Sequence, residues 1–352
     1  MPGHHLWRSL NEFQELTQNM RQSDDPEYGH INSAARLGTI TNQQVATLNT
    51  RLHLTVEQVI EAAPAQAMWV ASKNKIVDEV NTMFYQILTA NRGLPGFRFW
   101  AHHAPKNLSI EPPNRETCVK VLQIQGGRKS KLTDTEDGTC VRVHPNFVDL
   151  AIGMRVALTY NAATLIGLYA GSPGTIHSFA FPHAQQATEM PTANEAASIN
   201  ALLPVVFVVF DKYTGIPFNR PPEGETWELD DPRFRMVPIT ATPSKGALKH
   251  KYTRFQLPLR AAHATTIHKV QGMSCPIVLI PSPSPKDVFA MGLDYVGISR
   301  ARFLHELFIY CMDQFNTRSP GPPLTAGHFQ THADQRKRIA QEYARLRALF
   351  PY

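Results

Sequence analysis

Residues 265–274 read TTIHKVQGMS, and residues 292–302 read GLDYVGISRAR. Both stretches lie where helical and extended patterns alternate along the chain. The pattern predicts helix, strand, helix and strand in turn over RAAHATTIHKVQG (260–272), PIVLIP (276–281), YVGISRARF (295–303) and ELFIYC (306–311). Strands that alternate with helices are the unit of an α/β layer fold. The region therefore predicts an α/β domain.

The same alternation occurs before residue 90. QAMWVAS (66–72) predicts a short apolar strand, and KNKIVDEVNTMFYQIL (73–88) predicts a helix with an apolar stripe. TNQQVATLNTRL (41–52) predicts a helix that begins at a Thr41 cap. Residues 6–22, LWRSLNEFQELTQNMRQ, carry apolar residues at helical spacing. The N-terminal part thus has the α/β pattern as well.

The residues between these two parts have a different character. RVALTY (155–160), GTIHSFAF (174–181), LPVVFVVF (203–210) and FRMVPI (234–239) are short β-rich runs separated by Gly and Pro turns. A small barrel is the economical packing for residues 141–255. Residues 91–140 predict loops and a few short strands, and residues 182–198 predict an exposed polar insertion. Residues 332–350 predict an amphipathic helix.

Composition narrows the class of protein and of partner. The net charge of +6 favours a polyanionic partner, although a mildly basic soluble protein has the same balance. The four cysteines form no CxxC pair, so neither a zinc site nor a disulfide framework is expected, and a reducing compartment fits best. No apolar run approaches the ~20 residues that span a bilayer. We expect a soluble intracellular protein without a membrane partner, in the nucleus or mitochondrion if the source is eukaryotic.

The two opening stretches resemble motifs of a known family. FQLPLRAAHATTIHKVQGMSC and YVGISRAR are similar to motifs V and VI of superfamily 1 DNA helicases of the RecD and PIF type, whose patterns run roughly PL..A.A.TIHK.QG.T and YVALSRA. Residues 6–22 look like motif IV, and residues 36–51 look like the R.G..T..D...LN.R that follows it. Residues 152–176 are similar to G..VML..N......LVNGT.G.V of the inserted SH3-like barrel.

The resemblance implies both the fold and its division into domains. It implies a RecA-like parallel-sheet domain of the P-loop NTPase class, formed by residues 1–140, which include a loop-rich insertion, and by residues 256–316. A small SH3-like β-barrel would be inserted at residues 141–255, and residues 317–352 would form the C-terminal amphipathic helix. Departures such as YVGIS for YVALS and HKVQ for HKSQ are mild.

The resemblance also implies which residues act on the nucleotide. Arg300, and Arg21 in motif IV, match positions where the family places guanidinium groups against the γ-phosphate as arginine fingers. A planar guanidinium donates paired hydrogen bonds to phosphate oxygens and stabilises charge in the transition state. Gln271 and Gly272 match the nucleotide-cleft side of motif V, where glycine permits close backbone approach.

Thr266, His268 and Lys269 match the part of motif V that faces single-stranded DNA in the family. A hydroxyl, an imidazole and an ammonium group suit contacts with the sugar-phosphate backbone, which carry no base code. Taken alone, His268 would be interpreted as a structural histidine. Within the motif, we interpret it as part of a nucleic-acid contact.

A helicase also needs GxxxxGK[ST] to hold the nucleotide phosphates and an acidic strand end to hold Mg²⁺. The sequence contains neither, and QGGRKSK (125–131) and IVDEV (76–80) are the nearest approaches. We therefore expect the first RecA-like domain to be missing from this chain. ATP and Mg²⁺ are expected for the complete helicase, and this chain is expected to be inactive alone.

Three functions remain open, of which two act on nucleic acid and one is a protein-interaction remnant that uses the C-terminal helix. The first is the C-terminal portion of an ATP-dependent 5′–3′ DNA helicase, a family used in replication, DNA repair and recombination. The second is a non-catalytic module, derived from a helicase or mobile element, that binds single-stranded nucleic acid.

Several charged residues outside these motifs have simpler interpretations. Arg302 is interpreted as a surface or salt-bridge residue, and His328 with His332 lacks the third ligand that a metal site requires. A basic cluster before motif V is interpreted as a solvated loop or, alternatively, as a lining of the path of the DNA strand: Lys245, Lys249, Lys251 and Arg254. Residues 336–338 are interpreted as the solvent face of a helix.

Overall fold

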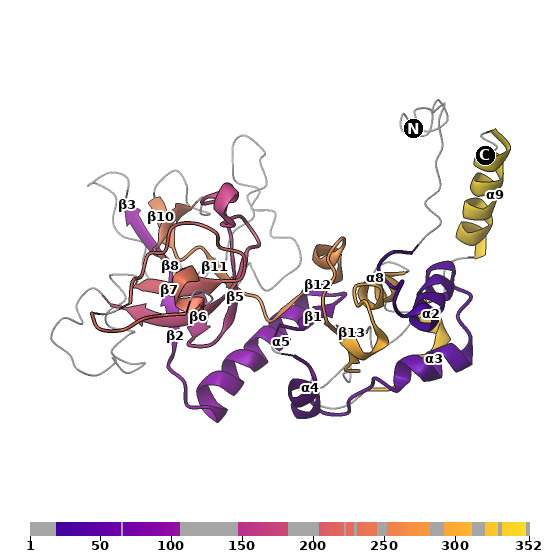
Figure 1. The fold of residues 1–352 in the computed structure, drawn as a ribbon, viewed down its shortest axis with the longest axis horizontal. Coiled ribbons are helices and arrows are strands. Elements are labelled where there is room, and N and C mark those ends of the chain that lie inside the picture. The colour runs from indigo at the N-terminus through magenta and orange to yellow at the C-terminus, as the bar shows by residue number, and fades with distance from the viewer. Residues whose placement is uncertain are drawn as a thin grey trace. The chain divides into compact units, whose positions relative to one another are not determined.

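The structure is a computed structural model, and it describes residues 19–64, 66–105, 147–181, 204–221, 223–228, 231–244, 252–281, 292–311, 321–329 and 333–349. The chain divides into two compact units (Figure 1). Residues Met1–Val80 and Ala264–Tyr352 form the first, which we call the α/β unit, and residues Asn81–His263 form the second, which we call the β unit. Among the described residues, no helix has both the length and the apolar character that crossing a membrane requires.

A four-stranded parallel sheet lies at the centre of the α/β unit. Its strands follow the order β12 (Ala264–Thr266), β1 (Met68–Ala71), β13 (Ile277–Ile280) and β14 (Leu307–Ile309). All four residues of β13 are fully buried, as expected for a central parallel strand that is covered on both faces. The strands predicted at 66–72, 276–281 and 306–311 are confirmed.

The α/β unit also contains helices and single turns. They are α2 (Pro26–Leu37), α3 (Asn42–Asn49), α4 (Val56–Ala62), α5 (Asn74–Gln86), η5 (Ile267–Val270), α8 (Leu293–Ile298), η7 (Leu304–Glu306), η8 (Ala326–Phe329) and α9 (Ala333–Leu349). Of these, α5 continues into the β unit. Thr41 caps α3 in a capping box with Gln44, and Thr55 caps α4 with Gln58. The predicted Thr41 cap is thus confirmed.

The LN.R residues have structural roles at the edge of this sheet. Asn49 bonds both the backbone N–H and the carbonyl of Leu324 through its side chain. The Arg51 guanidinium donates to the carbonyls of Leu307 and His305, and the backbone of Leu52 bridges to Ile309. The contacts of Arg51 and Leu52 thus cover the edge of β14 with chain from the N-terminal part.

The β unit is built from antiparallel strands. Five of them form a sheet in the order β11 (Leu259–Ala261), β5 (Arg155–Leu158), β6 (Pro173–Ala180), β7 (Val205–Phe210) and β8 (Met236–Ile239). Smaller sheets and turns are β2 (Gly96–Trp100) with β4 (Phe147–Ala151), β3 (His102–Pro105) with β10 (Tyr252–Gln256) and β9 (Thr242–Ser244), and η1 (Ile87–Asn91), η2 (Thr164–Ile166) and η4 (Pro232–Arg235). Their apolar side chains form a core separate from that of the α/β unit.

One predicted element is wrong. Residues 260–272 form β11, β12 and the 3-10 turn η5 instead of a helix. Backbone pairing outweighs the apolar spacing here, because Ala264–Thr266 align in parallel register with Trp69–Ala71. The helix predicted at 295–303 is present but ends at Ile298. The helix predicted at 6–22, apart from its last four residues, lies outside the described residues, as do the 182–198 insertion and most of 91–140.

Candidate functional site

The turn after β12 presents the residues that the sequence singled out. Ile267 and Val270 are fully buried in the core, and they fix η5 against the sheet. His268 and Lys269, which lie between them, are exposed. Thr266 precedes the turn, and its side chain makes no capping bond. The packing of two apolar residues therefore holds two basic side chains at the surface of the α/β unit.

This turn lies at the carboxyl edge of the parallel sheet, where α/β folds bind their ligands. Thr266 aligns with Ala71 at the end of β1, and Ser72 and Lys73 follow directly. Both strands therefore deliver polar residues to the same edge. The sequence motifs do not include Ser72 or Lys73, although polar residues between a strand and a helix are the signal for such an edge.

Charge is mixed close to the turn. Partial burial and the carboxylate of Glu79 raise the pKa of Asp78, and the ammonium group of Lys269 opposes that shift. Lys269 is therefore within electrostatic range of the first turns of α5.

Gln271 and Gly272 continue the chain beyond η5, and both are exposed. Gly272 has a φ of 88°, in the left-handed region. A Cβ atom added there would meet no atom within 4 Å. Among the described residues, backbone conformation and not packing therefore favours glycine at this position.

Arg21 and Arg300 come together although they lie near opposite ends of the described chain. The Arg21 guanidinium donates through Nε to the Ser274 hydroxyl at 2.8 Å and through Nη1 to the Ser299 carbonyl at 3.0 Å. The Arg300 guanidinium donates through Nη2 to the Ser299 hydroxyl at 2.7 Å and through Nε to the Val296 carbonyl at 2.9 Å. Ser299 therefore binds both guanidinium groups. We call Arg21, Arg300, Ser274 and Ser299 the arginine cluster.

The described residues supply no carboxylate counter-ion to the arginine cluster. In the part of the chain that the structure describes, neither Arg21 nor Arg300 forms an ion pair with a carboxylate. Arg300 is 8% exposed. Burial and then the neighbouring charge of Arg21 lower the pKa of Arg300, yet a guanidinium stays protonated at neutral pH. An anion would satisfy the electrostatics of such a site.

Contacts of α2, of α8 and of the residues just before α2 and just after α8 position this cluster. The Gln22 amide donates to the Ala301 carbonyl at 2.7 Å, and the buried Tyr28 hydroxyl donates to the Ile298 carbonyl at 2.5 Å. A Cβ on Gly297 would lie 2.7 Å from a methyl group of Leu279, so the glycine in YVGIS lets α8 pack closely on β13. The departure from YVALS at this position thus matches the local packing.

Arg302 and His328, which lie outside the motif V turn and the arginine cluster, have partners within the α/β unit. Arg302 forms an ion pair with Glu306 at 3.1 Å, which confirms its interpretation as a salt-bridge residue. His328 is buried and contacts Thr325 through Nδ1. Within the described ranges, no group of three or more His, Cys, Asp or Glu residues could hold a metal ion. The described residues do not include Lys245, Lys249, Lys251 or His332. They also do not include the side chains of Arg254 and residues 336–338.

The known proteins that this chain matches are helicases of the type that the sequence motifs resemble. No family model matches the chain. The chain is 28% identical over 324 residues to the ATP-dependent DNA helicase PIF7 of Trypanosoma brucei brucei (strain 927/4 GUTat10.1), a match that covers 88% of this chain and 29% of that protein. The chain thus spans less than a third of this relative.

Solved structures share the fold at low sequence identity. The Pif1 helicase from Candida albicans superposes with a TM-score of 0.55 and 16% identity, over 93% of this chain and 60% of that one. The Pif1 helicase from Bacteroides in complex with ADP-AlF3 and ssDNA gives a TM-score of 0.52 and 15% identity, over 94% and 57% respectively. These likenesses and the parallel sheet identify the fold of the α/β unit as RecA-like. Over most of its length, the chain is homologous to part of a PIF-type superfamily 1 DNA helicase.

Proposed function

We propose that this chain supplies the second RecA-like domain, with its inserted SH3-like barrel, of an ATP-dependent 5′–3′ DNA helicase. The observation that carries the proposal is the arginine cluster, in which Arg21 and Arg300 converge without a carboxylate. The homology to PIF-type helicases supports it. The phosphate-binding loop and the acidic residues for Mg²⁺ would come from a first RecA-like domain outside these 352 residues.

The hydrogen bonding of the arginine cluster fits a phosphate. A guanidinium has five N–H donors, and Arg21 and Arg300 each use only Nε and one Nη among the described residues. The remaining donors could bind the oxygens of a γ-phosphate from one side. In phosphoryl transfer, such donors stabilise the charge of the transition state, and a single arginine finger contributes roughly 10³ to 10⁵ in rate.

A short stretch of chain would link the nucleotide to the strand. Thr266, His268 and Lys269 would bind the sugar-phosphate backbone of single-stranded DNA, with Lys73 as a further contact at the same sheet edge. Gln271 and Gly272 come next in the sequence, and Ser274 then accepts a hydrogen bond from Arg21. A shift of the turn on binding DNA would therefore move a partner of the arginine cluster.

ATP hydrolysis tests this proposal. The chain alone should show background hydrolysis, whereas the chain joined to the first RecA-like domain of a PIF-type helicase should hydrolyse ATP in response to single-stranded DNA. Arg300→Ala should lower that kcat by about 10³-fold or more, and Arg302→Ala, which removes an arginine paired with Glu306, should not. If the chain alone hydrolyses ATP in response to DNA, and Arg300→Ala abolishes this activity, the proposal that a further domain is needed is contradicted.

A second candidate is a non-catalytic module that binds single-stranded nucleic acid. The exposed His268 and Lys269 on the sheet edge favour it. Affinity for an oligo-dT strand should then fall as salt rises, with a log–log slope that reports the number of phosphate contacts, and nucleotide should have no effect. His268→Ala with Lys269→Ala should weaken binding, while the exposed Lys212→Ala serves as a charge control in the β unit.

A further inference from the structure

The chain passes between the α/β unit and the β unit twice. The first passage is within α5, between Val80 and Asn81, and the second is between His263 and Ala264. Within the β unit, the rings of Phe84 on α5 and His263 are stacked with centroids 4.1 Å apart and planes 2° apart. The two connecting segments are therefore held against each other by an aromatic pair.

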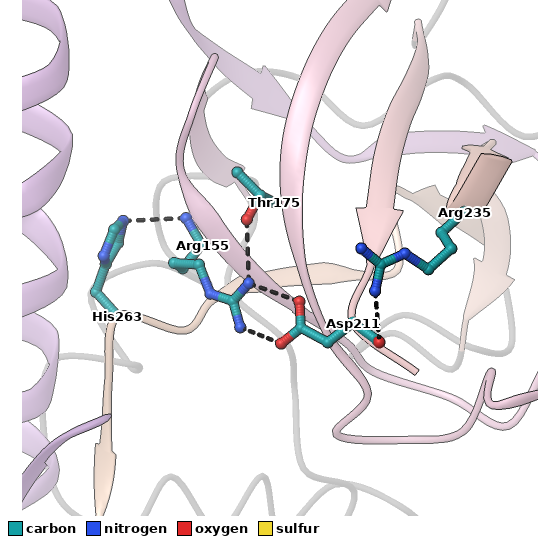
Figure 2. Close-up of polar contacts among 5 residues, drawn as sticks. All are labelled: Arg155, Thr175, Asp211, Arg235 and His263. Atoms are coloured by element: carbon teal, nitrogen blue, oxygen red, sulfur yellow. Dashed lines mark hydrogen bonds and ion pairs between the residues drawn. The ribbon is translucent and has the colours of Figure 1, made fainter. Parts of the chain in front are cut away.

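His263 also ends the pairing between β11 and β5. Ala261 lies opposite Val156, and the next residue, Ala262, donates from its N–H to the Arg155 carbonyl at 2.9 Å. The Arg155 N–H then donates to Nε2 of His263 at 3.0 Å (Figure 2). The imidazole takes the place of the next backbone acceptor at the point where the chain leaves the sheet.

This hydrogen bond defines the state of the imidazole. Nε2 accepts, so the ring proton lies on Nδ1. Burial, assisted by the charge of Arg155, lowers the pKa of His263 to about 3, so the ring is neutral at neutral pH. The bond is therefore present throughout the range in which nucleic-acid binding is measured.

Arg155 connects this exit point to the rest of the five-stranded sheet. Its guanidinium donates to the two carboxylate oxygens of Asp211 at 2.8 and 2.5 Å and to the Thr175 hydroxyl at 3.0 Å. Arg235 donates to the backbone carbonyl of Asp211 at 3.1 Å (Figure 2). Bidentate pairs of this kind fix orientation as well as charge. His263 is thus bonded to a residue that is itself anchored on β6 and beside the end of β7.

No loop separates His263 from β12. β12 begins at the very next residue, Ala264, and pairs with β1 from there to Thr266. The exposed turn with His268 and Lys269 follows without a loop. Any displacement of His263 would be passed along an extended strand to the candidate strand-binding residues.

We propose that His263 is a positioning residue that, clamped by Phe84 and Arg155, fixes the start of β12 and with it the turn at residues 266–269. This positioning rests on these contacts alone, whereas its use in strand binding rests on the proposed function.

Hydrogen exchange of the whole chain without DNA tests the clamp. His263→Ala should accelerate exchange at residues 264–270 by about tenfold. The control Val206→Ala, which destabilises the β unit from the buried centre of β7, should accelerate exchange within its own sheet and leave 264–270 unchanged. His263→Phe, which keeps a ring against Phe84 but removes the acceptor for the Arg155 N–H, should accelerate exchange at these residues by a smaller factor, and it carries the test if His263→Ala does not fold.

The outcomes separate the two proposals. Unchanged exchange at 264–270 in the His263 variants, an equal increase in Val206→Ala, or a His263→Phe variant as unprotected as His263→Ala would overturn the clamp. Affinity for oligo-dT is then measured on the same proteins. If the native chain binds no oligo-dT, the strand-binding role fails while the exchange result stands; if it binds, His263→Ala should weaken binding by several-fold.

Discussion

At the scale of single residues, Asp294 is the least expected feature of the α/β unit. It lies on α8, is fully buried, and both of its carboxylate oxygens lack a hydrogen-bond partner among the described residues. Burial raises its pKa to about 7, and burial together with this carboxyl raises the pKa of the Cys311 thiol to about 12. An unpaired buried carboxylate is costly when charged, so its protonation is linked to folding.

Stability should therefore depend on pH through Asp294. The folded-state pKa lies above the ordinary value of 3.8, so the stabilising protonated form is complete below that value and is lost as pH rises through about 7. Between pH 5 and pH 8 the free energy of unfolding should fall by on the order of 3 kcal/mol. Asp294→Asn should remove this part of the dependence, as measured by urea unfolding at both pH values. An unchanged pH dependence in the variant would contradict this assignment.

The sequence points to only part of the candidate site. Thr266, His268 and Lys269 can be picked out because they lie in one contiguous motif. Nothing in the spacing of Arg21 and Arg300 reveals that they share Ser299, and only the family resemblance placed them in one site. Ser72 and Lys73 were missed, because the register between β1 and β12 that brings them to the same edge is a tertiary property.

At the scale of elements, the two capping boxes show how strongly short helices depend on their ends. α3 has only eight residues, and Thr41 and Gln44 bond each other's backbone N–H groups. Thr41→Ala should lower the free energy of unfolding by about 1 kcal/mol. Thr47→Ala, inside the same helix, should be neutral or slightly stabilising because alanine is the better helix former. Chemical denaturation measures both, and equal effects would contradict the cap.

There is a physical reason why residues 260–272 do not form the predicted helix. Residues 260–272 carry Ile267 and Val270 at a spacing that a helix and a 3-10 turn share. The decisive contribution is the pairing of Ala264–Thr266 with β1 and of Leu259–Ala261 with β5, between residues far apart in sequence. The strands at 66–72 and 276–281 were predictable because their apolar runs are short and bounded by polar or proline residues.

At the scale of the whole molecule, the chain consists of two units with separate cores. The β unit is continuous in sequence, whereas the α/β unit is assembled from two segments. Residues 74–263, which include all of α5, should therefore fold when produced alone, with a cooperative thermal transition followed by circular dichroism. Absence of a cooperative transition would show that the core of the β unit needs the rest of the chain.

We propose that Arg300 acts on the transition state of ATP hydrolysis. The most direct measurement is the affinity of ADP with aluminium fluoride for the chain joined to the first RecA-like domain of a PIF-type helicase. Because arginine fingers act on charge that develops only in the transition state, Arg300→Ala should weaken binding of this mimic by about 10³-fold and leave ADP affinity unchanged. Equal loss for ADP and for the mimic, or no loss for either, would contradict the claim.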